Sequence, residues 1–120
     1  MPRTSSHSVR HDAVPEAVVV AAARTWFEQL RRDRLEVVRA GYFGSYARGD
    51  YVPASDFDVL LEVTQAPEVR RFEDRVDPYL PKAFPVGMSL LVYTTDELAR
   101  LRAENNAFIR SLESEMKSLD

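Results

Sequence analysis

Cysteine is absent from this 120-residue chain, and histidine occurs only twice. Without thiolates the chain can form neither disulfides nor cysteine-based metal sites, an absence that suits a cytoplasmic protein. Long apolar runs are also missing: the run 17–23 ends at Arg24, whereas about 20 apolar residues are needed to cross a bilayer. Pro15 and Glu16 precede the run, and helical periodicity continues beyond it. We therefore interpret it as part of a first helix, not as a signal peptide or a membrane span.

An excess of positive charge is missing as well. The formal net charge is −3, so no global basic field exists, and long duplex DNA or tRNA is not the expected partner. Hydrophobic residues make up 45% of the chain and charged residues 29%, as in ordinary globular proteins. A chain of this length suffices for one compact domain. Composition leaves homo-oligomerisation open.

The first twelve residues are polar, and we expect a flexible N-terminal tail over 1–12 followed by a single domain over 13–120. His7 and His11 lie in that tail. Their i, i+4 spacing would suit a metal on a helix, but the segment has no helical pattern and no nearby carboxylate cluster. We interpret both as solvated tail residues.

Strand-type residues occupy three segments, 35–43, 57–63 and 86–93. The first two are joined by about a dozen residues of loop character, which is short enough for an antiparallel pair around a functional loop. Helical patterns come before, between and after the strands. This order predicts an α/β (α+β) fold, in which a small mixed sheet of about three strands has helices packed against it.

Three helices are expected. The first starts near Pro15 and the second opens at Pro67. Thr94 and Glu97 have the spacing of a capping box at the start of the third, which is expected to break near Asn105-Asn106. The expected inner faces are Val19, Ala23, Trp26, Phe27 and Leu30 for the first helix, and Val69, Phe72, Val76 and Leu80 for the second.

Two carboxylates stand at the start of the second predicted strand. Asp56 and Asp58 are two residues apart, and the strand period of two puts both on one face of the sheet. Two carboxylates without histidine or cysteine suit Mg²⁺, or Mn²⁺, better than zinc. Because Mg²⁺ held by so few carboxylates commonly completes its shell with substrate phosphates, the pair points to a nucleoside triphosphate such as ATP.

Gly44 and Ser45 end the preceding strand, where the chain turns into a short helical segment. A glycine there lets the backbone approach an anion, and the following N–H groups can receive it. The Ser45 hydroxyl could bind a terminal phosphate oxygen. The sequence therefore predicts nucleotide binding by Gly44 and Ser45, and metal binding with a catalytic role for Asp56 and Asp58, at one edge of a two-strand unit.

The segments 44–50 (GSYARGD) and 55–60 (SDFDVL) resemble the GS-x-A-R-G-(D/E)…SD-x-D-h-h signature of the minimal nucleotidyltransferases of the DNA polymerase β superfamily. Antibiotic nucleotidyltransferases and the MntA-type antitoxins that work beside HEPN-domain proteins belong to this group. Segments 91–98 and 105–109 resemble the strand-to-helix junction and the closing helix of the same small proteins. The resemblance implies a nucleotidyltransferase fold, with transfer of a nucleoside monophosphate from an NTP to a hydroxyl. A HEPN-type partner protein supplies one candidate acceptor.

One position departs from the family pattern. Members usually carry a third carboxylate on the last strand, and aligning Tyr93 and Thr94 with that pattern puts Ser89 in its place. A serine hydroxyl is a poor Mg²⁺ ligand. The alternative to an active enzyme is therefore a weak or inactive module that binds a nucleotide or a partner protein.

Neighbouring residues have ordinary interpretations too. Arg48 could contact a phosphate or form an ion pair with Asp50 or Asp56 that fixes the loop. Tyr46 is more often packed than stacked on a base. Glu62 shares the face of the two acids by parity, but lies too far along the strand to replace a third carboxylate.

Overall fold

The computed structural model describes residues 13–120. The expected tail 1–12, with His7 and His11, lies outside this range. The elements follow one another as α2 (Glu16–Asp33), β1 (Val37–Phe43), α3 (Ser45–Arg48), β2 (Phe57–Val63), the 3₁₀ helix η1 (Phe72–Tyr79), β3 (Met88–Thr94), α4 (Thr95–Ala103), α5 (Ala107–Glu115) and β4 (Lys117–Ser118).

The sheet has the strand order β3-β2-β1-β4. β1 is antiparallel to both β2 and β4, whereas β2 and β3 are parallel, so the predicted mixed sheet is confirmed. It has four strands instead of about three. The extra strand, β4, is only two residues long, too short for an alternating pattern to announce it.

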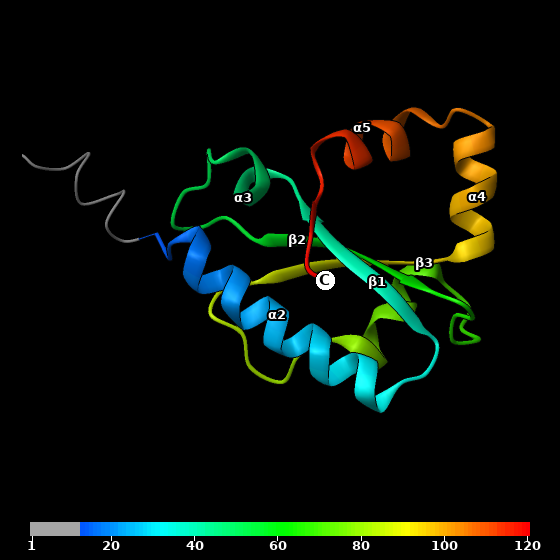
Figure 1. Ribbon diagram of the computed structural model, residues 1–120, viewed down its shortest axis with the longest axis horizontal. Coiled ribbons are helices and arrows are strands. Elements are labelled where there is room, and N and C mark those ends of the chain that lie inside the picture. Colours follow the sequence, from blue (N-terminus) through cyan, green and yellow to red (C-terminus); the bar gives the residue numbers. More distant parts are fainter. Residues whose placement is uncertain (1–12) are drawn as a thin grey trace, which may run out of the picture.

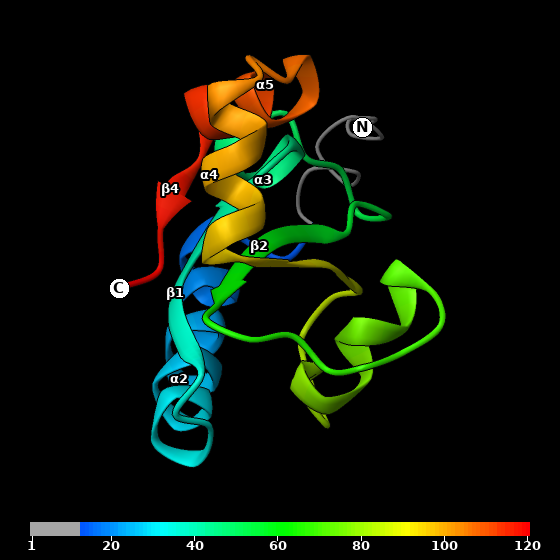
Figure 2. The same cartoon turned by 90° about the vertical axis from the view of Figure 1, so that its right-hand side faces the viewer.

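Helices cover both faces of the sheet. In Figure 1, α2 lies along one side of the strands while α4 and α5 lie on the other, and Figure 2 shows the same separation from a second direction. Buried apolar residues form a larger cluster shared by α2 and the sheet. A smaller cluster joins Leu60 of β2 to Leu98, Ile109 and Leu112 of the last two helices. Successive residues of β2 therefore point to different clusters, as strand geometry requires.

The first helix follows its predicted face. Pro15 is the residue before α2, and its carbonyl accepts hydrogen bonds from the N–H groups of Val18 and Val19. Val19, Ala23, Phe27 and Leu30 are buried, and Trp26 packs at their margin. Of the helices within residues 13–120, none has the length and apolar character needed to span a membrane.

The prediction of a second long helix is wrong. Only the 3₁₀ helix η1 forms, from Phe72 to Tyr79, and the proposed inner-face residues Val69, Phe72 and Leu80 are exposed. Pro78 lies inside η1 and cannot donate a backbone hydrogen bond, which disfavours a continuous α-helix. The buried residue of this segment is instead Tyr79, whose carbonyl accepts a 2.8 Å hydrogen bond from the Trp26 indole N–H.

The predicted closing helix is broken at Asn105-Asn106 into α4 and α5. Asn105 has a φ of 55°, and the Asn106 side chain caps α5 by accepting from the Ile109 N–H at 3.0 Å. The capping box at the start of α4 is also present: the Thr94 hydroxyl accepts from the Glu97 N–H, and the Glu97 carboxylate accepts from the Thr94 N–H. Both local predictions are confirmed.

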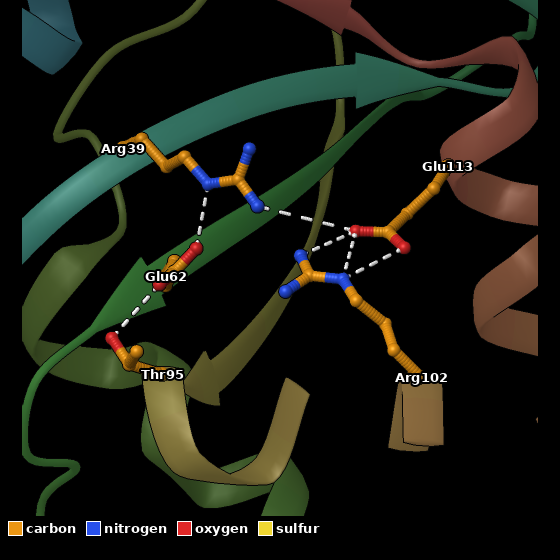
Figure 3. Close-up of polar contacts among 5 residues, drawn as sticks. All are labelled: Arg39, Glu62, Thr95, Arg102 and Glu113. Atoms are coloured by element: carbon orange, nitrogen blue, oxygen red, sulfur yellow. Dashed lines mark hydrogen bonds and ion pairs between the residues drawn. The ribbon is translucent and has the colours of Figure 1, made fainter. Parts of the chain in front are cut away.

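A polar network fastens the last two helices to the sheet (Figure 3). The buried Glu62 carboxylate accepts from Arg39 at 2.6 Å and from the Thr95 hydroxyl at 2.8 Å. Arg102 of α4 binds Glu113 of α5 with contacts down to 2.6 Å, and Arg39 approaches the same Glu113 carboxylate at 4.0 Å. α5 is thus tied both to α4 and to β1.

Candidate functional site

Strand register brings the start of β2 next to the two segments singled out from the sequence. Asp58 is paired with Phe43 of β1 on one side and with Ser89 of β3 on the other. Gly44 directly follows Phe43, so the glycine turn lies beside Asp58. The structure therefore brings the turn, the acid and the position of the expected third acid to one edge of the sheet.

Gly44 is a position that only glycine fits. Its φ is 75°, a left-handed conformation that other residues rarely adopt. A Cβ atom placed on it would also overlap the Asp58 carboxylate. The turn and the metal-binding candidate are therefore packed directly against each other, and Ser45 follows as the first residue of α3.

Asp56 occupies a similar place against a second glycine. It precedes β2 and is exposed, and a Cβ on Gly87 would overlap its carboxylate. The hydrogen bond from the Phe57 N–H to the Gly87 carbonyl, 2.8 Å long, joins the two segments at this point. Gly87 was not singled out in the sequence, where a lone glycine before a strand carries little information.

The electrostatics of the site centre on Asp58. Burial raises the pKa of its carboxyl above the ordinary value, and the nearby Asp56 charge raises this pKa further. The Arg48 guanidinium and a hydrogen bond with the Ser89 side chain act in the opposite direction, while Glu115 adds to the rise. Asp58 is therefore harder to ionise in the folded chain than an ordinary aspartate, and a bound cation would favour its ionised form.

The donor set fits a hard divalent cation with few protein ligands. Asp56 and Asp58 supply carboxylate oxygens, as Mg²⁺ or Mn²⁺ requires. Within residues 13–120 no group of three or more histidine, cysteine, aspartate or glutamate side chains is gathered closely enough to hold a metal. Ser89, beside Asp58, is exposed and neutral. Such a site needs additional oxygen ligands from outside the chain.

Sequence analysis missed Glu115, the last residue of α5. Its Oε1 accepts a hydrogen bond from the Gly44 N–H at 2.8 Å and lies 3.3 Å from Nη1 of Arg48. An acidic residue at the C-terminal end of a helix is unfavourable with respect to the helix dipole. That misplaced charge was the available signal, although it does not reveal which loop the side chain contacts.

The other residues of the motif have structural partners. Arg48 binds Asp50 at 3.2 Å in addition to Glu115, so the loop-fixing interpretation applies. Tyr46 is buried, stacks on Tyr51 with ring centroids 4.2 Å apart, and donates its hydroxyl hydrogen to the Val14 carbonyl. It is packed, as expected for a tyrosine there.

Two surface pockets lie away from the four predicted site residues. One of about 980 Å³ runs between α2 and residues 78–83, and another of about 810 Å³ is lined largely by residues 64–72. Neither is lined by Gly44, Ser45, Asp56 or Asp58. The chemistry suggested by the acids therefore belongs to the open edge of the sheet.

Known proteins resemble most of this chain in sequence pattern and in fold. A family model described as a nucleotidyltransferase domain matches residues 24–119. A candidate nucleotidyltransferase from Sulfolobus solfataricus, solved at 1.40 Å resolution, has a similar structure, with a TM-score of 0.55 and 20% sequence identity. The alignment covers 82% of this chain and 85% of that one, and at this identity it shows a shared fold. No curated protein sequence matches the chain.

Proposed function

This chain belongs to the nucleotidyltransferase domain family, and from that premise we propose that it binds a nucleoside triphosphate with Mg²⁺ or Mn²⁺ and transfers the nucleoside monophosphate to a hydroxyl. The observation that carries the proposal is the packing of Gly44 against Asp58. It joins a turn suited to phosphate with a carboxylate suited to a metal ion. Either feature alone would be a common structural detail.

Gly44 and Ser45 are the proposed triphosphate-binding residues. The positive φ of Gly44 turns the chain sharply out of β1, and the half-buried Ser45 begins α3 directly after the glycine that packs against Asp58. Its hydroxyl and the backbone N–H groups that follow Gly44 are the donors that would bind phosphate oxygens. ATP is the triphosphate to test first.

Asp56 and Asp58 are the proposed metal-binding and catalytic residues. A divalent cation held there would neutralise charge on the triphosphate. The raised pKa of Asp58 and its charged neighbour Asp56 support this assignment, because Arg48 offsets the negative charge of the pair only in part. In the proposed transfer the acceptor oxygen bonds to the α-phosphorus, the bond from that phosphorus to its bridging oxygen breaks, and pyrophosphate leaves. The hydroxyl proton must be taken up by a base or by solvent.

Ser89 supports a second candidate function. It stands directly beside Asp58 in the β2–β3 pairing, where a third carboxylate is expected from the motif resemblance. A neutral hydroxyl neither binds Mg²⁺ strongly nor removes a proton readily. The second candidate is therefore a catalytically weak or inactive module that binds a nucleotide or a partner protein.

The acceptor we propose is a hydroxyl on a partner protein, in a cytoplasmic antitoxin-like setting. The support is the motif resemblance to MntA-type antitoxins, whose partners contain HEPN domains. The short loop between β1 and β2 and the small sheet offer no second domain within residues 13–120 that could build a pocket for a small-molecule acceptor.

Transfer from radiolabelled ATP tests the enzyme proposal. The protein is incubated with ATP, Mg²⁺ or Mn²⁺, and candidate acceptor proteins that include a HEPN-domain protein, and labelled products are separated. Label transfer that disappears in Asp58→Asn supports the enzyme. MgATP binding without transfer supports the binding module, and the absence of both contradicts the enzyme and any module that acts by binding nucleotide.

A further inference from the structure

Glu115 contacts the proposed nucleotide site at the Gly44 backbone N–H, a different point of the turn from the one that Asp58 occupies. Its Oε1 accepts from the Gly44 N–H at 2.8 Å, and both of its carboxylate oxygens lie within 3.4 Å of Nη1 of Arg48. Asp58 packs against the same glycine at the position of its missing Cβ. The glycine turn is therefore held between two carboxylates from different parts of the chain.

The Gly44 turn needs a hydrogen-bond acceptor from another part of the chain. Gly44 is the residue that caps α3, and it has no side chain with which to fix the start of that helix. Its N–H is buried with the residue, and a buried N–H without an acceptor is costly. A charged acceptor makes the stronger type of hydrogen bond. Glu115 satisfies this donor and fixes the direction in which the turn leaves β1.

The segment around Glu115 is itself anchored. Two residues earlier, Glu113 binds Arg102 in the network of Figure 3. Two residues later, Lys117 is paired with Tyr42 of β1 in the two-residue strand β4. The carboxylate thus reaches the turn from a chain segment whose position is defined on both sides.

We propose that Glu115 is a positioning residue of the nucleotide site, which orients the Gly44 turn and Arg48 so that Ser45 can meet the triphosphate. This inference rests on the proposed function. The opposing idea is that the Glu115 carboxylate competes with a substrate phosphate for the Gly44 N–H and so weakens nucleotide binding. The burial of Gly44 favours positioning, because Glu115 already satisfies the buried N–H from within the folded chain.

Calorimetric titration with MgATP tests the proposal in the full chain. Glu115→Ala should bind MgATP about tenfold more weakly than the unmodified protein, since it loses a charged hydrogen bond that orients the site. Glu115→Gln keeps an oxygen acceptor for the Gly44 N–H and should rescue affinity to within about threefold. Unchanged or tighter binding by Glu115→Ala would overturn positioning, and tighter binding would identify competition.

Glu97→Gln is the control for a merely structural effect. Glu97 binds Arg75 at 2.7 Å and caps α4, so its loss lowers stability without touching the turn. Its affinity for MgATP should stay within about twofold of the unmodified protein, because global destabilisation leaves a folded site intact. If Glu97→Gln weakens binding as much as Glu115→Ala does, the positioning role is contradicted.

Amide hydrogen exchange provides a readout that needs no nucleotide. Glu115→Ala should speed exchange of the Gly44 amide about tenfold and leave the Leu60 amide in β2 unchanged. Equal exchange at Gly44 in both proteins would overturn the positioning role. If the unmodified protein fails to bind MgATP, the proposed function fails, and the exchange result alone decides whether Glu115 orients the turn.

Discussion

Ser89 of β3 lies directly beside Asp58 of β2 in the parallel strand pair. The Ser89 side chain acts on Asp58 as a hydrogen-bond partner that lowers its pKa, against the larger effects of burial and of Asp56. A carboxylate at position 89 would instead share the face and the edge of the sheet with Asp58. We therefore propose Ser89 as the position at which an efficient transferase and a binding module are told apart.

Ser89→Asp is predicted to strengthen metal binding and raise the rate of transfer. A third carboxylate beside Asp58 adds a hard oxygen ligand, for which we expect roughly a tenfold gain in affinity for Mn²⁺. Manganese titration followed by electron paramagnetic resonance measures the binding, and the labelled-ATP assay measures the rate. The binding-module interpretation is wrong if the unmodified protein is already fully active and the substitution changes neither quantity.

Asp58→Asn is predicted to raise the melting temperature while removing the response to metal. The raised pKa of Asp58 means that its ionised form is less favourable in the folded chain than in the unfolded one. This penalty is absent below the ordinary carboxyl pKa and grows as the pH rises through the raised pKa, and asparagine, which carries no charge, eliminates it. Thermal unfolding at pH 7 with and without Mg²⁺ checks both parts. A lower melting temperature for the variant would contradict the electrostatic account.

Gly44→Ala is predicted to be the most disruptive small substitution at the site. Alanine there faces a positive φ and an overlap with the Asp58 carboxylate, and we expect about 2–4 kcal/mol of destabilisation with loss of MgATP binding. Chemical denaturation measures the stability change, and calorimetry measures the binding.

Gly49→Ala is the matched control for that variant. Gly49 also has a positive φ, of 89°, but a Cβ on it would meet no atom within 4 Å. The Gly49→Ala variant should lose only about 1–2 kcal/mol of unfolding free energy, from the strained backbone conformation, and keep Asp58 in place. Equal loss of nucleotide binding in the two variants would show that the contact between Gly44 and Asp58 is not what matters.

Glu97 is predicted to give the protein an acid-sensitive increment of stability. Its bidentate contact with Arg75, at 2.7 and 2.9 Å, lowers the pKa of Glu97 to about 2 from an ordinary value of 4.5. A depressed carboxyl pKa contributes stability above the unfolded value, and that contribution is lost as the pH falls from 4.5 towards 2. At pH 7, Glu97→Gln should cost on the order of 2 kcal/mol.

Denaturant unfolding across this pH range checks the sign. The difference in unfolding free energy between Glu97→Gln and the unmodified protein should be largest above about pH 5 and shrink as the pH approaches 2. A difference that grows on acidification would contradict the assigned role of Arg75.

Local patterns identified much of the fold because the residues that determine it are close together in sequence. The capping box of Thr94 and Glu97 needs only a spacing of three, and the break at Asn105 needs only side chains that tolerate a turn. The 3₁₀ segment η1 was misjudged because apolar spacing at Val69 and Phe72 imitated a helix. There the prolines and the packing of Tyr79 determined the outcome.

Non-local contacts account for what the sequence could not reveal about the site. Asp58, Gly44 and Ser89 could be grouped from a motif and its expected strand. Glu115 is 71 residues from Gly44, and its contact depends on where α5 lies against the sheet. The Arg102–Glu113 pair and β4 hold the chain on either side of Glu115, and neither has a recognisable sequence signal.

Calorimetric titration of ATP into the protein, with Mg²⁺ and then with the metal chelated, tests the central claim most directly. The account predicts saturable binding of one ATP that weakens at least tenfold without Mg²⁺ and in either Asp56→Asn or Asp58→Asn. Binding that is indifferent to the metal and to both acids, or no binding at all, would contradict the assignment of this site.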